Sequence, residues 1–276
     1  MSYVVMPKED YKNTCDTIRE KTSDTEPIKS GELAEKVDKV YDAGQKALWD
    51  IVTQNNTRES WSYLSTGWHC EYLRPPYKIC PTSGTIAQMF SENHALKKVE
   101  SEYFDFSGYT PTQTTGTSAW YGTFRASINL EEIEDLGMKA GGYYQTFSSC
   151  SSLKKIAVVR SQAETAWNGA FSSCKALEEI RIKNNDDEVG TIGQNGFNVS
   201  ACTKLSKASM LSILNACNKA NAGVTITLPK LCPDLNAEIG VDSTKELGDV
   251  LVNGYDSELS EAWTVAFHNN YTIAYA

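Results

Sequence analysis

One short pattern returns four times between residues 86 and 199, and it constrains the fold more than any other feature. It begins at a phenylalanine, which is followed six residues later by leucine and nine residues later by valine or isoleucine. The phenylalanines Phe90, Phe124, Phe147 and Phe171 lie 34, 23 and 24 residues apart. The later positions are Leu96, Leu130, Leu153 and Leu177, then Val99, Ile133, Ile156 and Ile180. A period of this length is typical of a solenoid, whose units bury their apolar faces only by stacking on their neighbours.

The spacing within one unit predicts a turn followed by a short strand. The phenylalanine points inward from a short helical or irregular turn, and the leucine and isoleucine point to the core. The two residues between them, such as Lys154-Lys155 and Glu178-Glu179, face water. Strands from successive units would lie about 4.8 Å apart in a parallel ladder. Phe197 begins a degenerate fifth copy in which the leucine moves to Leu205.

The third residue after each phenylalanine is small, as a tight turn with partly buried peptide groups requires. These residues are Asn93, Ser127, Cys150, Cys174 and, in the degenerate copy, Ser200. Cys150 and Cys174 share one position, so stacking would bring them within disulfide reach. We favour the alternative of two buried thiols, and the absence of a C-x-x-C pair gives no reason to expect zinc.

Two of the units, TFSSCSSLKKI and AFSSCKALEEI, carry an F-x-x-C-x-x-L-x-x-I core. This core resembles the leucine-rich repeats of the BspA-like bacterial kind. The resemblance implies an α/β fold, namely a leucine-rich-repeat solenoid with a parallel β ladder and short helical or irregular turns. It implies no particular activity, because one fold hosts many unrelated functions.

The N-terminal residues 1–52 predict a helical arm. A short helix is expected within residues 6–27, and a second begins near Ser30 and runs for about five or six turns. Its apolar stripe predicts either packing on its own domain or oligomerisation and docking. The candidate oligomerisation residues are Leu33, Val37, Val40, Leu48 and Ile51.

The order CDTIREKT, PIKSGELAEKV and VYDAG in this arm resembles the N-terminal segment of structural proteins from the tail regions of phages and prophages of Gram-positive bacteria. The resemblance implies a virion protein made in the host cytoplasm and associated with the tail, baseplate or tail fibre. Its partners would be other virion proteins, further copies of itself (a trimer is favoured) and a host cell-surface glycan or protein. The alternatives are a capsid decoration protein and a bacterial cell-surface leucine-rich-repeat adhesin.

Residues 53–85 are rich in tryptophan, tyrosine and proline, which favours an aromatic cap over the first coil. A sugar-binding aromatic platform is the alternative. Residues 86–205 would then hold the repeats and residues 206–276 a C-terminal αβ cap. In that cap we expect a helix from Ser206 to Gly223, a strand over residues 224–228, helices from about Ser243 and over residues 257–267, and a strand over residues 271–275.

Aromatic residues also gather in the loops between units, where insertions often carry binding contacts. If the loops lie side by side, they form an aromatic ridge suited to adhesion, through a glycan or protein. The alternative places the same rings between the coils. The candidate residues are Tyr103, Tyr109, Trp120, Tyr121, Tyr143, Tyr144 and Trp167.

Composition and motifs limit the partners and activities that we expect for this chain. A net charge of −9 and the absence of a basic cluster argue against nucleic acid and anionic membranes, and no apolar run suggests membrane insertion or a secretory signal. The three histidines stand apart, and no catalytic motif appears. Asp186-Asp187-Glu188 fits an acidic turn better than a calcium loop. We therefore expect no catalytic residues, cofactor or metal, although a glycosidase would need only two suitably placed carboxylates.

Overall fold

The structure of the protein is a computed structural model that describes residues 71–75, 78–82, 86–111 and 120–276. The predicted oligomerisation residues of the arm and most of the aromatic segment lie outside these ranges. The chain divides into two compact units, and every described residue except Pro75 belongs to the unit made of Asn56–Arg74 and Lys78–Ala276.

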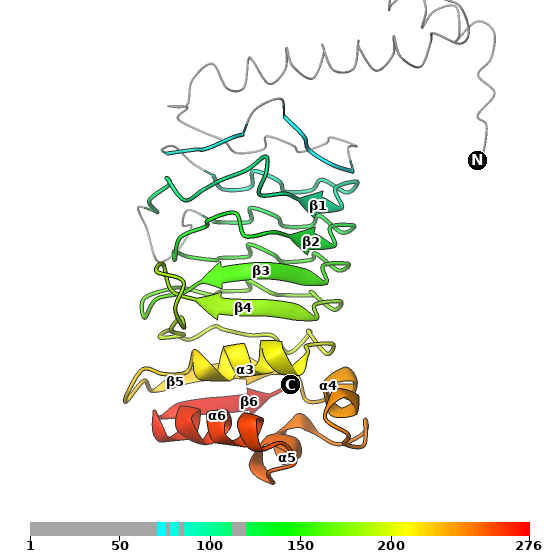
Figure 1. Ribbon diagram of the computed structural model, residues 1–276, viewed down its shortest axis with the longest axis vertical. Coiled ribbons are helices and arrows are strands. Elements are labelled where there is room, and N and C mark those ends of the chain that lie inside the picture. Colours follow the sequence, from blue (N-terminus) through cyan, green and yellow to red (C-terminus); the bar gives the residue numbers. More distant parts are fainter. Residues whose placement is uncertain (1–70, 76–77, 83–85, 112–119) are drawn as a thin grey trace, which may run out of the picture. The chain divides into compact units, whose positions relative to one another are not determined.

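Four parallel strands form one sheet in chain order, so the fold is mixed α/β with a parallel sheet (Figure 1). The strands are β1 (Lys98–Val99), β2 (Glu132–Ile133), β3 (Lys155–Arg160) and β4 (Glu179–Lys183). Val99 lies opposite Ile133, Ile133 opposite Ile156, and Ile156 opposite Ile180. The parallel ladder that the repeat predicts is confirmed, residue against residue, because equivalent apolar positions meet on the buried side.

A buried column of phenylalanine rings runs beside the ladder. Phe90, Phe124, Phe147 and Phe171 stack with ring centroids 5.2, 5.7 and 5.5 Å apart and ring planes within 14° of parallel. Hydrogen bonds hold this side of the coils together, because the phenylalanine N–H donates to the carbonyl of the residue that precedes the next phenylalanine. The bonds join Phe90 N to Thr123 O at 2.7 Å, Phe124 N to Thr146 O at 2.9 Å, and Phe147 N to Ala170 O at 3.0 Å.

In three units the small residue three positions after the phenylalanine forms a hydrogen bond to the preceding unit. Its hydroxyl or thiol donates to the carbonyl oxygen of the phenylalanine in that unit. These bonds join Ser127 Oγ to Phe90 O at 2.7 Å, Cys150 Sγ to Phe124 O at 2.9 Å, and Cys174 Sγ to Phe147 O at 3.0 Å. The two cysteines are free and buried, as we favoured, and no disulfide joins them. Burial raises the pKa of the Cys174 thiol to about 12, so it stays protonated and keeps its donor.

The turns around the phenylalanines use left-handed backbone at two fixed places. The residues two before and two after each phenylalanine all have φ between 52° and 65°. They are Gln88, Gly122, Gln145 and Gly169 before the ring, and Glu92, Ala126, Ser149 and Ser173 after it. Because most of these residues carry a side chain, each such turn stores some backbone strain that the stacking must offset.

The ladder begins at least one rung before the first predicted repeat. Tyr72 forms a parallel bridge with Lys98, and the Lys97 N–H donates to Glu71 O at 2.9 Å. The same bond joins Glu131 N to Lys97 O at 2.7 Å in the next coil. Leu73 is buried. The sequence pattern does not predict this rung, because no phenylalanine begins it.

The C-terminal part contains helices and a second parallel pair of strands. The elements are α3 (Lys207–Asn215), β5 (Val224–Leu228), α4 (Pro233–Glu238), α5 (Leu247–Val252), α6 (Ser257–His268) and β6 (Tyr271–Tyr275), and β5 pairs with β6 along its whole length. Both predicted strands and helix α6 are confirmed. Ser206 is confirmed as the N-cap of α3, because its side chain accepts a hydrogen bond from Ser209 N.

Three details of the helix predictions are wrong. Helix α3 ends at Asn215 rather than near Gly223, because the Ile192 N–H binds Ala216 O at 2.8 Å and Asn218 binds Gly190 O, which hold the chain against the repeat stack. Helix α5 begins at Leu247 rather than Ser243. Helix α4 was not predicted, although a proline at its first position is a known start signal.

Helix α3 closes the free edge of the ladder (Figure 1). Ser209 Oγ accepts from Ile180 N at 3.0 Å and donates to Glu178 O at 2.8 Å. Ser212 Oγ accepts from Ile182 N at 2.8 Å. Serine hydroxyls thus satisfy backbone groups of β4 that another strand would otherwise bind, which protects the edge from pairing with a foreign chain.

Candidate binding surfaces

Four of the predicted aromatic contact residues are buried. Tyr109, Trp120, Tyr143 and Trp167 are at most 4% exposed, so they cannot form an exposed ridge, and the alternative of rings packed between coils is correct for them. The polar atoms of two of these rings are hydrogen-bonded in the interior. Trp120 Nε1 donates to Lys139 O and Tyr143 OH to Arg160 O, each at 2.9 Å. The rings are buried because they extend the phenylalanine column sideways, as in the stacked pair Tyr143 and Trp167 at 5.2 Å.

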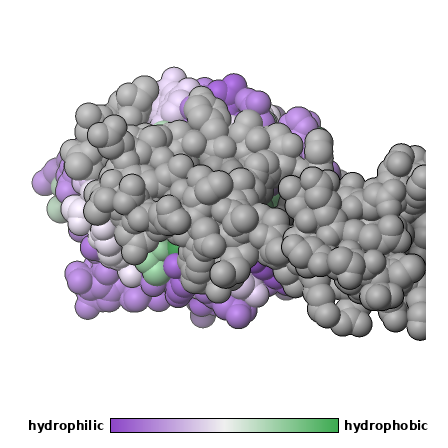
Figure 2. Space-filling model, turned by 90° about the horizontal axis from the view of Figure 1, so that it is seen from above, coloured by the Kyte–Doolittle hydropathy of each residue, from purple (hydrophilic) through white to green (hydrophobic). Residues whose placement is uncertain are grey.

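The other three aromatic candidates keep part of their surface in contact with solvent. Tyr121 and Tyr144 stack on each other with centroids 5.4 Å apart, and Tyr103 stands apart from them in the earlier loop. The described residues that are visible around the grey atoms in Figure 2 are mainly hydrophilic. The partly exposed tyrosines therefore remain candidates for contacts, but as a small stacked pair and one further ring.

The outward face of the ladder carries charges that alternate in sign from coil to coil. The two positions between leucine and isoleucine hold Lys97-Lys98, Glu131-Glu132, Lys154-Lys155 and Glu178-Glu179. Ion pairs therefore run along the stack. They join Lys98 to Glu132 at 3.3 Å, Lys154 to Glu131 at 2.8 Å, and Lys155 to Glu132 at 3.3 Å and to Glu179 at 3.9 Å. Two of these charged pairs, Lys154-Lys155 and Glu178-Glu179, were predicted to face water, and the alternation of sign becomes visible in the sequence once all four units are aligned.

Charges beside the ladder are also paired. Glu134 accepts from Lys98 Nζ at 2.6 Å and from Ser101 N and Oγ, and these bonds lower the pKa of its carboxyl to about 2, the lysine contributing most. The Arg160 guanidinium binds both oxygens of Asp135, at 2.7 and 2.9 Å, and Asp187 at 2.7 Å. These contacts fix the segments that follow β2 and β4.

The residues Asp186-Asp187-Glu188 form an acidic turn, as we expected. Asn184 Oδ1 accepts from the N–H groups of Asp186 and Glu188, at 2.8 and 3.0 Å, while the Asp187 carboxylate points to Arg160. Within the described residues no group of three or more metal-ligating side chains gathers. Among the helices of that part, none has both the length and the hydrophobicity that crossing a membrane needs.

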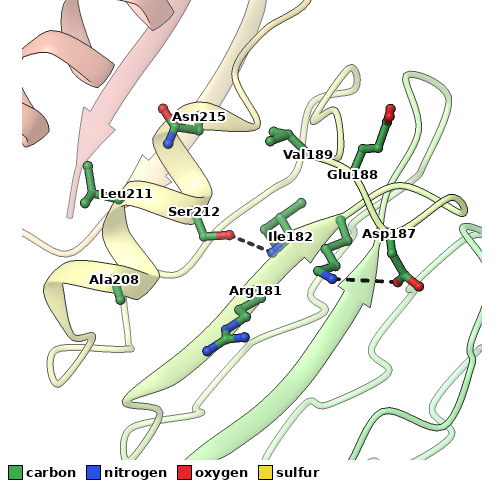
Figure 3. A pocket seen from close by; sticks show the side chains of 10 residues that line it. Arg181, Ile182, Asp187, Glu188, Val189, Ala208, Leu211, Ser212 and Asn215 are labelled. Atoms are coloured by element: carbon green, nitrogen blue, oxygen red, sulfur yellow. Dashed lines mark hydrogen bonds and ion pairs between the residues drawn. The ribbon is translucent and has the colours of Figure 1, made fainter.

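A hollow of about 510 Å³ lies between β4, the acidic turn and α3 (Figure 3). Its lining combines cations and carboxylates with aliphatic side chains and an amide. The lining residues are Arg181, Ile182, Lys183, Asp187, Glu188, Val189, Ala208, Leu211, Ser212 and Asn215. These side chains can pair with charges, exchange hydrogen bonds and contact apolar groups. The sequence pattern does not predict the hollow, because its walls come from separate elements that tertiary contacts bring together, among them the serine bonds between α3 and β4.

A second hollow of about 330 Å³ adjoins the first along α3. It is lined by Leu211 and Asn215, which both hollows share, and by Glu258, Glu261, Ala262 and Val265 of α6. The Glu258 carboxylate binds Lys207 Nζ at 2.7 Å. The two hollows together follow the outward side of α3, and we call them the α3 groove.

Comparison with known proteins yields no relative: no protein-family model, no curated protein and no solved structure matches this chain.

Proposed function

We propose that the chain is a leucine-rich-repeat solenoid that serves as a non-enzymatic structural and binding component of a phage virion, associated with the tail, baseplate or tail fibre. The observation that supports a binding scaffold best is the residue-for-residue ladder of Val99, Ile133, Ile156 and Ile180. A stack of equivalent coils offers a long, regular surface, and such surfaces are suited to presenting contacts.

The outward charges favour a rigid scaffold. Lys98, Glu132, Lys155 and Glu179 pair with one another along the stack, so the ladder face holds its own side chains in place. A face of this kind loses little side-chain freedom when it meets a partner. The partner would be another virion protein or a host cell-surface glycan or protein.

The virion assignment rests on the resemblance of the N-terminal arm to phage tail proteins. In this proposal the arm joins copies of the chain, with a trimer favoured, through Leu33, Val37, Val40, Leu48 and Ile51, which lie outside the described residues. The test is the solution mass of the full chain by light scattering, beside a Val37→Asp/Val40→Asp variant. A trimer that becomes a monomer in the variant supports the proposal, and a monomeric full chain contradicts assembly through the arm.

The location can be tested directly. Particles purified from a strain that produces this protein would be labelled with gold-conjugated antibody and viewed by electron microscopy. Gold on the tail or baseplate is the expected result. Gold on the head would identify a capsid decoration protein, and labelling of intact cells without labelling of particles would favour the adhesin.

A further inference from the structure

The α3 groove has the form of a site for a short length of polypeptide. Its two hollows, of about 510 and 330 Å³, adjoin at Leu211 and Asn215 and extend from β4 on one side to α6 on the other. Two linked hollows can each take a side chain of one extended or helical segment. A partner segment could therefore lie along α3 and reach both.

Aliphatic side chains remain exposed in this groove. Val189 is 54% exposed in the first hollow and Val265 is 48% exposed in the second, and Leu211 between them is half-buried. Water contact with such surfaces is unfavourable, and removing it would contribute to binding. The occupant should therefore carry aliphatic or aromatic side chains.

At the β4 end of the groove lies Arg181, a cation that pairs with no carboxylate in the part of the chain that the structure describes. Arg181 lies on the same side of β4 as Glu179 and Lys183, which pair with Lys155 and Asp187. Arg181 itself has no ion pair or side-chain hydrogen bond to any described residue. On one side the β3 bulge places Ala157-Val158 beside it, and on the other side lie Ala208 and Leu211 of α3. The carboxylates that line the same hollow, Asp187 and Glu188, lie on the turn after β4, away from Arg181 (Figure 3), and Asp187 is bound by Arg160 and Lys183.

The charged residues that line the second hollow are both carboxylates. Glu258 pairs with Lys207, whereas Glu261 forms no ion pair within the described part of the chain. The first hollow therefore offers an occupant's carboxylate the guanidinium of Arg181, on the side away from the acidic turn (Figure 3), whereas the charged residues of the second hollow would repel it. This difference fixes the direction in which an acidic segment would lie.

We propose that the α3 groove binds a peptide segment of a partner protein in which aliphatic side chains stand next to an acidic residue, with the carboxylate on Arg181 and the apolar side chains against Val189, Leu211 and Val265. This inference rests on the proposed function only because both make the chain a binding module. A failure to find the protein in virions would leave the groove proposal intact, and a failed peptide selection would leave the virion assignment intact.

The experiment is a selection of random twelve-residue peptides, displayed on yeast, against the full chain, with counter-selection against the full-length Arg181→Glu variant. We expect enriched peptides to combine Asp or Glu with Leu, Ile, Val or Phe within a few positions. Synthetic versions, measured by fluorescence anisotropy, should bind at least tenfold more weakly to Arg181→Glu and to Leu211→Glu. Binding should also weaken as salt is added, because the arginine contact is solvent-accessible.

Two matched variants control for charge and folding. Arg125→Glu makes the same charge change on the turn beside Phe124, and Val252→Glu places a carboxylate at an exposed aliphatic position outside the groove. Both should bind within twofold of the wild type. If Leu211→Glu has a lowered urea midpoint, Leu211→Ala replaces it. The proposal is overturned if selected peptides lack the acidic and aliphatic pairing, or if the groove variants bind them as tightly as the controls do.

Discussion

Two columns of side chains run along the same stack, and they differ in how residue types succeed one another. The buried column repeats one residue, phenylalanine, in four coils, with rings nearly parallel at 5.2 to 5.7 Å. The outward column instead alternates lysine and glutamate, so that each rung faces the opposite charge. Identical rings attract one another when stacked, whereas identical charges repel. The apolar pattern therefore repeats every coil and the charge pattern every second coil.

The two columns contribute differently to folding: the buried rings supply most of the stabilisation, and the charges favour the correct register of the units. Burial of the rings removes large apolar areas from water, which is the dominant favourable contribution to folding. The surface ion pairs contribute far less each, but they penalise a shift by one coil, because such a shift would bring like charges together. The predictions below test this division.

The largest effect is expected in the buried column. Phe147→Ala should lower the free energy of unfolding by about 3 to 5 kcal/mol, because it leaves a cavity between two stacked rings. Urea unfolding monitored by circular dichroism measures it. The matched control is Phe267→Ala, where the ring is 60% exposed and the loss should stay below about 1 kcal/mol. Equal losses in the two variants would show that the column contributes little.

A smaller effect is expected in the charged column. Lys155→Glu places a carboxylate directly opposite Glu132 and Glu179, and should cost about 1 to 2 kcal/mol at low salt. Adding Glu179→Lys should recover part of the loss, because one of the two rungs again faces the opposite charge. Urea unfolding at low and at 1 M salt measures both variants. A loss that salt does not reduce would contradict an electrostatic origin.

Acid should weaken the ion pair between Glu134 and Lys98 of the charged column. The pKa of Glu134 is lowered to about 2 in the folded protein, so its contribution is present above the ordinary value of 4.5 and is lost as pH falls from 4.5 to about 2. Glu134→Gln should therefore be less stable than the wild type by about 1 kcal/mol at pH 6, allowing for solvent screening, and the two should converge near pH 2. The comparison needs urea midpoints at several pH values. If the difference in stability between the wild type and Glu134→Gln stays the same at every pH, its cause is packing rather than charge.

The smallest effect concerns the strained turns. Ala126 has φ of +59°, so Ala126→Gly should stabilise the chain by about 0.5 kcal/mol, the relief of strain slightly exceeding the entropy cost of glycine. Gly169→Ala, at φ +65° and with no atom closer than 3.4 Å to the added methyl group, should act in the opposite direction. Thermal unfolding of the pair measures both changes. The same sign in both variants would contradict backbone strain as the cause.

Strand register and one helix start could be predicted from the sequence, because each depends on residues close together in the chain. The offset from phenylalanine to isoleucine predicts the register of Ile133, Ile156 and Ile180, because one face of each strand must be buried. Ser206 predicts the start of α3, because a serine side chain can accept from the N–H groups of the first helical turn. Both rules need only a few neighbouring residues.

The direction of a side chain could not be predicted from the sequence where it depends on residues of another coil. Whether Trp120 points inward is decided by the left-handed backbone at Gly122 and by the carbonyl of Lys139. Non-glycine residues such as Gln145 give no sign of a positive φ in the sequence. The α3 groove likewise depends on how Ser209 and Ser212 attach α3 to β4, and serines of this kind are common in any chain.

The alternating charges also restrict how such a chain can lengthen by gene duplication. If a single unit of 23 or 24 residues were copied in place, its lysines or glutamates would face a neighbour of the same sign. A duplicated pair of units would bring one rung of each sign and leave every contact favourable. We therefore expect length variants of this chain that gain or lose an even number of coils to be more stable than those that change by an odd number, which favours the pair of coils as the unit of inheritance.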